Sequence, residues 1–182
     1  MATIENVTTA EQLLAARDIG RCELVRGEVI MMSPAGSEHG RIVARLTVRL
    51  GMFVEQHLAG TVFGAETGFR IGHDPDTVRA PDVAFVTARR IGVKLLPGFF
   101  PGPPDLAVEV LSPDDRAGDV LAKVQDWLAA DCRAVWVVDP RTRTVSVYRS
   151  PSEIIVLGES ETLSGGDLVP NFSLPVSECF QG

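Results

Sequence analysis

Two acidic residues interrupt otherwise apolar stretches of this chain, and their chemistry suits a divalent cation. Glu109 lies inside LAVEVL, residues 106–111, and Asp82 opens DVAFV, residues 82–86. A carboxylate among aliphatic side chains is costly unless a cation or a hydrogen-bond donor meets it. Two carboxylates that converge from neighbouring strands would offer oxygen ligands to a hard cation such as Mg²⁺, which keeps several of its waters. Such an ion polarises a phosphoryl oxygen and lowers the pKa of a bound water.

Lys123 lies in the next predicted element, the helix over residues 115–130, and together with the two carboxylates it would form a site that can hydrolyse a phosphodiester. An ammonium group close to the reacting phosphorus orients the attacking water and stabilises the negative charge that develops in the transition state. Sequence spacing alone does not bring the three side chains together. A structural Glu109, paired with an arginine, is the alternative interpretation.

The element that must position Glu109 is a central β-strand within PDLAVEVLSPDD, residues 104–115. Apolar residues occupy both alternating sets of positions in this stretch, as expected for a strand that is buried on both faces. Ser112-Pro113 ends the strand, and Asp114-Asp115 opens a helix over residues 115–130. The strand therefore carries its carboxylate close to its C-terminal end, where α/β folds usually place their chemistry. Residues 80–87 form a second strand, which carries Asp82.

The longest predicted helix runs from residue 38 to residue 57, with Ser37 as its cap and an apolar stripe that includes Ile42, Leu46 and Leu50. His39 falls on that face at the N-terminal end of the helix. Arginines recur at every fourth position on another face, which is typical of a solvated surface, with phosphate contact as the alternative. These arginines are Arg41, Arg45 and Arg49.

The remaining segments predict a β-rich protein with short connections. Residues 89–104 are rich in glycine and proline and include Phe99 and Phe100, so we expect a long loop that serves as a lid or a partner surface. The other predicted elements are a short helix capped at Thr8 or Thr9, a hairpin over 22–32 with its turn at Arg26-Gly27, one or two strands in 60–71, a loop at 73–77, strands at 132–140, 144–150 and 153–157, and a final segment at 174–180.

Composition places the chain among soluble globular proteins with one domain, residues 1–182. Apolar residues make up 45% and charged residues 23% of the sequence, and no apolar run is long enough to cross a bilayer. The N-terminus lacks the order of a signal peptide, and three widely spaced cysteines fit neither a zinc site nor a disulfide framework. We therefore expect a cytoplasmic protein without a membrane partner. The net charge of −7 argues against a protein that coats nucleic acid non-specifically, but it leaves a metal-dependent nuclease open.

Several pieces of the chain, in this order, resemble the Uma-type "putative restriction endonuclease" family of the PD-(D/E)xK nuclease superfamily. The matching pieces are ELVRGE, SEHGRI, VRAPDVAF, DLAVEVLSPDDR, KVQDWL and VWVVDPRTRTVSVYR. The resemblance implies an α/β (α+β) fold in which helices flank a mixed β-sheet, with an N-terminal hairpin and a β-rich C-terminal part.

The resemblance also implies the site residues. Asp82 and Glu109 would be catalytic and would bind the metal together with Val110, and His39 or Glu38 at the start of the long helix would complete the site. The superfamily pattern has lysine two residues after the glutamate, where this chain has Leu111. Some members move that lysine to the following helix, and Lys123 fits the moved position.

Three functions follow as hypotheses. The first is an endonuclease that uses Mg²⁺, for which Mn²⁺ can substitute, to hydrolyse DNA and leave a 5′-phosphate and a 3′-hydroxyl. The second is a catalytically silent binding or dimerisation module that keeps the fold. The third is a metal-dependent hydrolase of small phosphate esters. A homodimer is compatible with all three.

Overall fold

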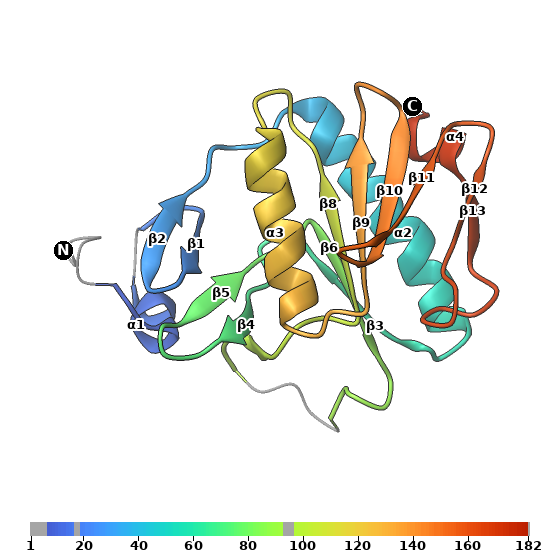
Figure 1. Ribbon diagram of the computed structural model, residues 1–182. Helices are drawn as coiled ribbons and strands as arrows, with labels where there is room; N and C mark the ends of the chain where they lie inside the picture. Colours follow the sequence, from blue (N-terminus) through green and yellow to red (C-terminus); the bar gives the residue numbers. More distant parts are fainter. Residues whose placement is uncertain (1–6, 17–18, 93–96, 182) are drawn as a thin grey trace.

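The computed structural model describes residues 7–16, 19–92 and 97–181, and its centre is a six-stranded mixed sheet (Figure 1). All neighbouring strands of this sheet run antiparallel except β8 and β9, which are parallel and are joined through helix α3. In spatial order its strands are β11 (Glu153–Leu157), β10 (Thr144–Ser150), β9 (Ala134–Asp139), β8 (Leu106–Val110), β6 (Val83–Thr87) and β3 (Gly60–Gly64). This is the mixed sheet with flanking helices that the sequence predicts.

Two helices cover opposite faces of the six-stranded sheet. Helix α2 (Ser37–Gln56) packs on one face, and helix α3 (Ala117–Ala129) packs on the other (Figure 1). The residues of β8 alternate between the two cores: Leu106, Val108 and Val110 contact the α2 side and Ala107 the α3 side. All five residues of β8 are buried, which confirms the prediction of a central strand.

A five-stranded sheet packs beside the main sheet and contains the predicted N-terminal hairpin. Helix α1 (Ala10–Ala15) begins at Thr9, whose side chain forms the predicted capping box with Gln12. In spatial order the strands are β2 (Glu28–Met31), β1 (Cys22–Val25), β5 (Thr77–Arg79), β4 (Phe69–Gly72) and β7 (Phe100–Pro101). The chain ends with a two-stranded sheet and a short helix, which are β12 (Thr162–Ser164), β13 (Ser173–Pro175) and α4 (Val176–Phe180).

The arginine row of α2 binds the C-terminal helix, so the prediction of a solvated surface is wrong for Arg41 and Arg45, while Arg49 is exposed as predicted. Arg41 donates to the carbonyl oxygen of Phe180 at 3.1 Å, and Arg45 donates to that of Glu178 at 3.3 Å. Arg49 forms an ion pair with the Glu178 carboxylate at 2.8 Å. Cationic side chains beside the last carbonyl groups of α4 complete hydrogen bonds that the helix itself leaves open.

Two of the predicted helix starts are also wrong. Helix α2 is capped by Gly36 without a side-chain hydrogen bond, and Ser37 is already its first helical residue. The helix after β8 is capped by Arg116, because the Asp115 carboxylate instead accepts the backbone N–H of Ser112 at 2.7 Å and closes a turn. Asp115 thus has a local partner that the sequence pattern does not specify.

The loop segments contain more order than the sequence predicts. Thr77 begins β5 rather than ending a loop, and the buried Asp76 before it accepts hydrogen bonds from Ala10 N at 2.7 Å and Arg70 at 2.9 Å. Phe99 and Phe100 are half-buried against two of the cores, and Phe100 pairs with β4, so neither forms a free partner surface. Residues 93–96 of this predicted lid lie outside the described residues.

Two expectations about the chemistry of the chain can be compared with the structure directly. Cys22, Cys132 and Cys179 are free thiols, as their spacing predicts. Among the helices in the described ranges, none has the length and apolar character needed to cross a membrane.

Leu50 tests the contribution of α2 to the core. This side chain is 2% exposed, whereas Val48 on the same helix is 56% exposed. Leu50→Ala should lower the free energy of unfolding by about 2–5 kcal/mol, the usual range for emptying a buried leucine site. Val48→Ala, the matched control, should change it by no more than about 0.5 kcal/mol. Urea denaturation measures both, and equal losses would contradict the assignment of the buried face.

Candidate active site

Glu109 lies in β8, and Asp82 directly precedes the neighbouring strand β6. The antiparallel register of β6 and β8 pairs Val83, the residue after Asp82, with Val108, the residue before Glu109. Asp82 N donates to the carbonyl oxygen of Val108 at 3.0 Å, one residue out of the regular register, where the ladder ends. Glu109 contacts residues of α3, whereas Asp82 contacts His39 of α2. The negative charge of Asp82 nevertheless acts on Glu109 and raises the pKa of that carboxyl.

The Asp82 carboxylate is buried and already has polar partners. The residue is 5% exposed, and its Oδ2 accepts the backbone N–H of Val110 at 2.8 Å. The same oxygen lies 3.1 Å from His39 Nε2. The other oxygen, Oδ1, is 3.8 Å from the Arg21 guanidinium. Asp82 is thus fixed in orientation by one oxygen, while its second oxygen has only a distant cation.

His39 reaches Asp82 from the first turn of α2. Its side chain is 11% exposed, and its Nδ1 is buried without a hydrogen-bond partner among the described residues. The hydrogen bond with Asp82 raises the pKa of His39, although burial acts in the opposite direction. The sequence prediction of an apolar-face histidine at this end of the helix is consistent with its position.

Glu109 is held by two donors from α3. Its Oε1 accepts the indole N–H of Trp127 at 2.9 Å, and its Oε2 lies 3.3 Å from Lys123 Nζ. Burial raises the pKa of the Glu109 carboxyl to about 7, and the negative charges of Asp82 and Glu23 act in the same direction. Lys123 and the Trp127 hydrogen bond oppose this rise without cancelling it.

Lys123 bridges two carboxylates. Its Nζ lies 3.5 Å from Glu23 Oε1, in addition to its contact with Glu109. Burial disfavours the charged ammonium, but the two carboxylates outweigh that effect and raise the pKa of Lys123. The side chain is therefore held as a cation at the site.

A set of charged residues behind Lys123 is missing from the predicted site. Glu23 in β1 is 2% exposed and accepts from Arg79 at 2.7 Å and from Ala80 N at 3.0 Å. Arg79 also contacts Asp126 of α3, three residues after Lys123. The sequence contains one indication of this group, which is the acidic Glu23 among the apolar residues of β1. Its partners come from β5 and α3, and such distant pairings do not follow from local patterns.

The structure separates the other predicted site residues from this group. Glu38 is exposed in the first turn of α2, and within the described ranges it has no hydrogen bond or ion pair with Asp82 or Glu109. The Val110 side chain is buried on the α2 side, and its backbone N–H serves Asp82. The structure thus forms two contact pairs, His39 with Asp82 and Lys123 with Glu109, and the backbone N–H of Val110 beside Glu109 binds Asp82.

The donor set fits a cation that keeps most of its waters. In the described part of the chain, no three His, Cys, Asp or Glu side chains converge as a ready-made metal cluster. Two buried carboxylates that raise each other's cost of ionisation nevertheless form a site where a divalent cation would be stabilising, because burial and the charge of Asp82 raise the pKa of Glu109. Mg²⁺ commonly binds through one or two carboxylates and water.

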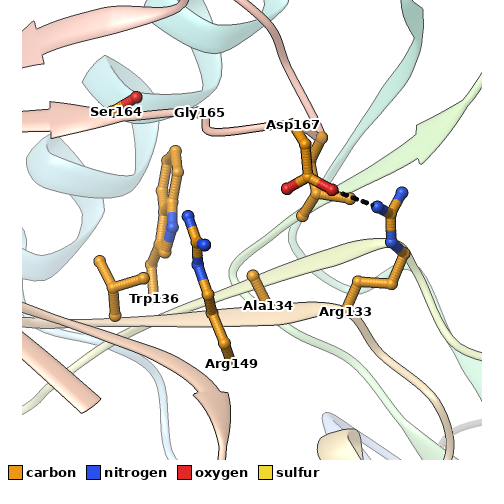
Figure 2. Close-up of a pocket in the computed structure, with 9 residues that line it drawn as sticks. Arg133, Ala134, Trp136, Arg149, Ser164, Gly165 and Asp167 are labelled. Carbon is orange, nitrogen blue, oxygen red and sulfur yellow. Dashed lines mark hydrogen bonds and ion pairs between the residues drawn. The ribbon is translucent and has the colours of Figure 1, made fainter. Parts of the chain in front are cut away.

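A small cavity lies away from this acidic site. Its volume is about 210 Å³, and its wall includes Trp136, Arg133 and Arg149 (Figure 2). Arg133 forms an ion pair with Asp167 at 2.6 Å on one side of the cavity (Figure 2). Trp136 belongs to the core on the α2 side of the sheet, opposite to the face that carries Glu109. The cavity is therefore not part of the carboxylate site.

Comparison with known proteins connects this geometry to one group. The family model Uma2, described as "Putative restriction endonuclease", matches residues 8–177. A crystal structure titled as a "putative nuclease belonging to DUF820 from Anabaena variabilis ATCC 29413" has the same fold, with a TM-score of 0.81 and 22% sequence identity over 94% of this chain and 97% of that one. No curated protein sequence shows a significant match.

The raised pKa of Glu109 has a consequence for stability without metal. The carboxyl titrates near 7 when folded, against an ordinary 4.5, so the folded state holds its proton more tightly than the unfolded state does. The free energy of unfolding should therefore fall as pH rises through this window. Glu109→Gln removes this contribution, and its stability relative to the wild type should rise by roughly 2–3 kcal/mol between pH 5 and pH 8. Urea denaturation at both pH values, in EDTA, gives the difference, and parallel profiles would contradict a raised pKa of the buried Glu109 carboxyl.

Proposed function

The chain belongs to the Uma2 family, and from this premise we propose that it is a metal-dependent endonuclease that hydrolyses phosphodiester bonds of DNA. The observation that carries the proposal is the grouping of Asp82, Glu109 and Lys123. Asp82 accepts the backbone N–H of Val110, next to Glu109, and its charge raises the pKa of Glu109, while Lys123 Nζ is 3.3 Å from Glu109. Family membership and fold support a nuclease, while the buried acid pair and the retained lysine support an active one.

Mg²⁺ or Mn²⁺ is the proposed cofactor. Asp82 and Glu109 would hold it through their carboxylates, and Val110 would contribute its carbonyl oxygen, the only metal-ligating atom that a valine offers. When bound, the ion supplies a polarised phosphoryl oxygen and an acidified water. The remaining catalytic work belongs to the side chains of the chain itself.

Lys123 is the group that we place beside the attacking water and the developing charge. Its two carboxylate partners, Glu109 and Glu23, keep it protonated, so it acts as a hydrogen-bond donor and a positive charge rather than as a base. Trp127 fixes the other oxygen of Glu109, and His39 and the Val110 N–H fix Asp82. Such preorganised donors lower the barrier because they need no reorientation during the reaction. The proposed products carry a 5′-phosphate and a 3′-hydroxyl.

A catalytically silent module with the same fold is the second candidate, and Leu111 at the usual lysine position favours it. The ion pairs of Lys123 favour the enzyme, because a lysine that reaches Glu109 from α3 replaces the missing one. A hydrolase of small phosphate esters is the third. Duplex DNA should compete with a small chromogenic phosphodiester for the site if DNA is the substrate.

Metal-dependent thermal stability separates the enzyme from the silent module. Millimolar Mn²⁺ should raise the melting temperature of the wild type, because the ion binds only the folded state. The shift should be larger at pH 8 than at pH 6, because Glu109, with a pKa of about 7, must lose its proton to bind. Asp82→Asn should abolish the shift, with equal or higher stability in EDTA. If the wild type shows no metal-dependent shift at either pH, the silent module becomes the better account.

Substitution of Lys123 tests the catalytic role. Lys123→Ala should reduce cleavage of plasmid DNA by roughly 10²–10³-fold, the range for loss of one preorganised donor, while the metal-dependent melting shift persists. Arg133→Ala is the matched control, since Arg133 is a cation paired with Asp167 beside the distant cavity, and it should cleave at the wild-type rate. An unchanged rate in Lys123→Ala would remove this residue from the mechanism.

A further inference from the structure

Strand β11 forms one edge of the six-stranded sheet and carries a run of exposed aliphatic side chains. Ile154, Ile155 and Val156 are 46%, 49% and 59% exposed. The register with β10 places Ile155 opposite Val147, on the α2 side of the sheet, and places Ile154 opposite Tyr148, on the α3 side. Among the residues that the structure describes, nothing covers Ile154, Ile155 and Val156 on either face of the strand or along its outer edge.

This edge lacks the features that usually protect a strand from pairing with another chain. Within residues 153–157 there is no proline, no lysine and no inward-pointing charge at the centre. The irregularity in the β10–β11 ladder lies in β10, between Tyr148, which pairs with Ile154, and Ser150, which pairs with Glu153, so the outer strand itself has no bulge within the exposed run. Among the described residues, β11 has no strand partner on its outer side. An open apolar edge of this kind is a template for strand addition.

We propose that β11 is a homodimer interface, at which two copies of this chain pair their β11 strands antiparallel about Ile155. In this register Ile155 opposes Ile155 of the second copy, and Ile154 opposes Val156. Each central pair then joins two β-branched aliphatic side chains, which are favourable cross-strand partners. The partner is a second copy because a two-fold axis through Ile155 pairs the exposed aliphatic side chains of the run only with one another and separates the two Glu153 charges.

The charges at the ends of the strand are compatible with this pairing. Glu153 is the charged residue of β11, and the register places it opposite Leu157 of the second copy. The two Glu153 residues are then four positions apart along the strands, or roughly 13 Å at the usual rise per residue. Each Glu153 keeps Arg149 of its own chain at 3.9 Å. The short strand also indicates a small interface, and hence a dimer that dissociates on dilution.

The joined sheet would present both acidic sites on one side. Directly opposed residues of an antiparallel pair share a face, so the α3 faces of the two copies become continuous. Three strand steps separate β11 from β8 in each copy. At about 4.8 Å per step, the two Glu109 strands would lie roughly 34 Å apart across the dimer. The dimer proposal itself does not depend on the proposed nuclease activity.

Analytical ultracentrifugation over a range of concentrations tests the interface. The wild type should approach about 39 kDa, twice the 19.6 kDa of one chain, at high micromolar concentration and should dissociate on dilution. Ile155→Lys should remain monomeric throughout, because the two-fold axis sets the new charges opposite each other. Ile30→Lys is the matched control: Ile30 is 46% exposed on β2, the edge strand of the other sheet, and its substitution should leave the dimer intact.

A cysteine scan tests the register and does not require the lysine variant to fold. Ile155→Cys should form an intermolecular disulfide on mild oxidation, because opposed strand residues have Cα separations within disulfide range. Val156→Cys opposes Ile154 rather than itself and should cross-link at least tenfold less. The wild type, with Cys22 half-buried and Cys132 and Cys179 buried, is the background control. A monomeric wild type at every concentration, a dimer lost in Ile30→Lys but kept in Ile155→Lys, or equal cross-linking of both cysteine variants would each overturn the proposal.

Discussion

The buried carboxylate of Glu109 is the constraint on which the site depends. It lies on the central strand of the sheet, where burial raises its pKa to about 7, and it is held at 2.9 Å by Trp127 and at 3.3 Å by Lys123. Both donors come from α3, so the helix must dock on this face for the charge to be tolerated. The parallel connection from β8 through α3 to β9 provides that docking within one short stretch of chain.

The second sheet completes the electrostatic arrangement. Glu23 of β1 and Arg79 of β5 extend the alternation of charges from Glu109 through Lys123 to Asp126. Each charged group in this series contacts at least one group of opposite sign, which limits the cost of burying them together. The packing of the five-stranded sheet against the main sheet and the ionisation of Lys123 are therefore linked, because loss of Glu23 would leave both Lys123 and Arg79 with one carboxylate fewer.

The sequence predicts the strands of this fold better than its tertiary polar contacts. Period-two alternation locates β8 and the hairpin of β1 and β2, and a carboxylate within an apolar strand identifies Asp82 and Glu109. The N-caps of α2 and α3, Gly36 and Arg116, cannot be predicted from the sequence, because neither residue forms a capping hydrogen bond through its side chain. The binding of the α2 arginines to α4, and the place of Glu23 beside Lys123, depend on contacts between elements distant in sequence.

The central claim is that Asp82 and Glu109 together hold a divalent cation. The most direct measurement is a crystal structure of the protein soaked in Mn²⁺ at pH 8, with anomalous difference maps recorded near the manganese edge. We predict one strong peak within about 2.2 Å of an oxygen of each carboxylate, with the remaining positions filled by water. A map without a peak between them, in a crystal that binds Mn²⁺ elsewhere or not at all, would contradict this account.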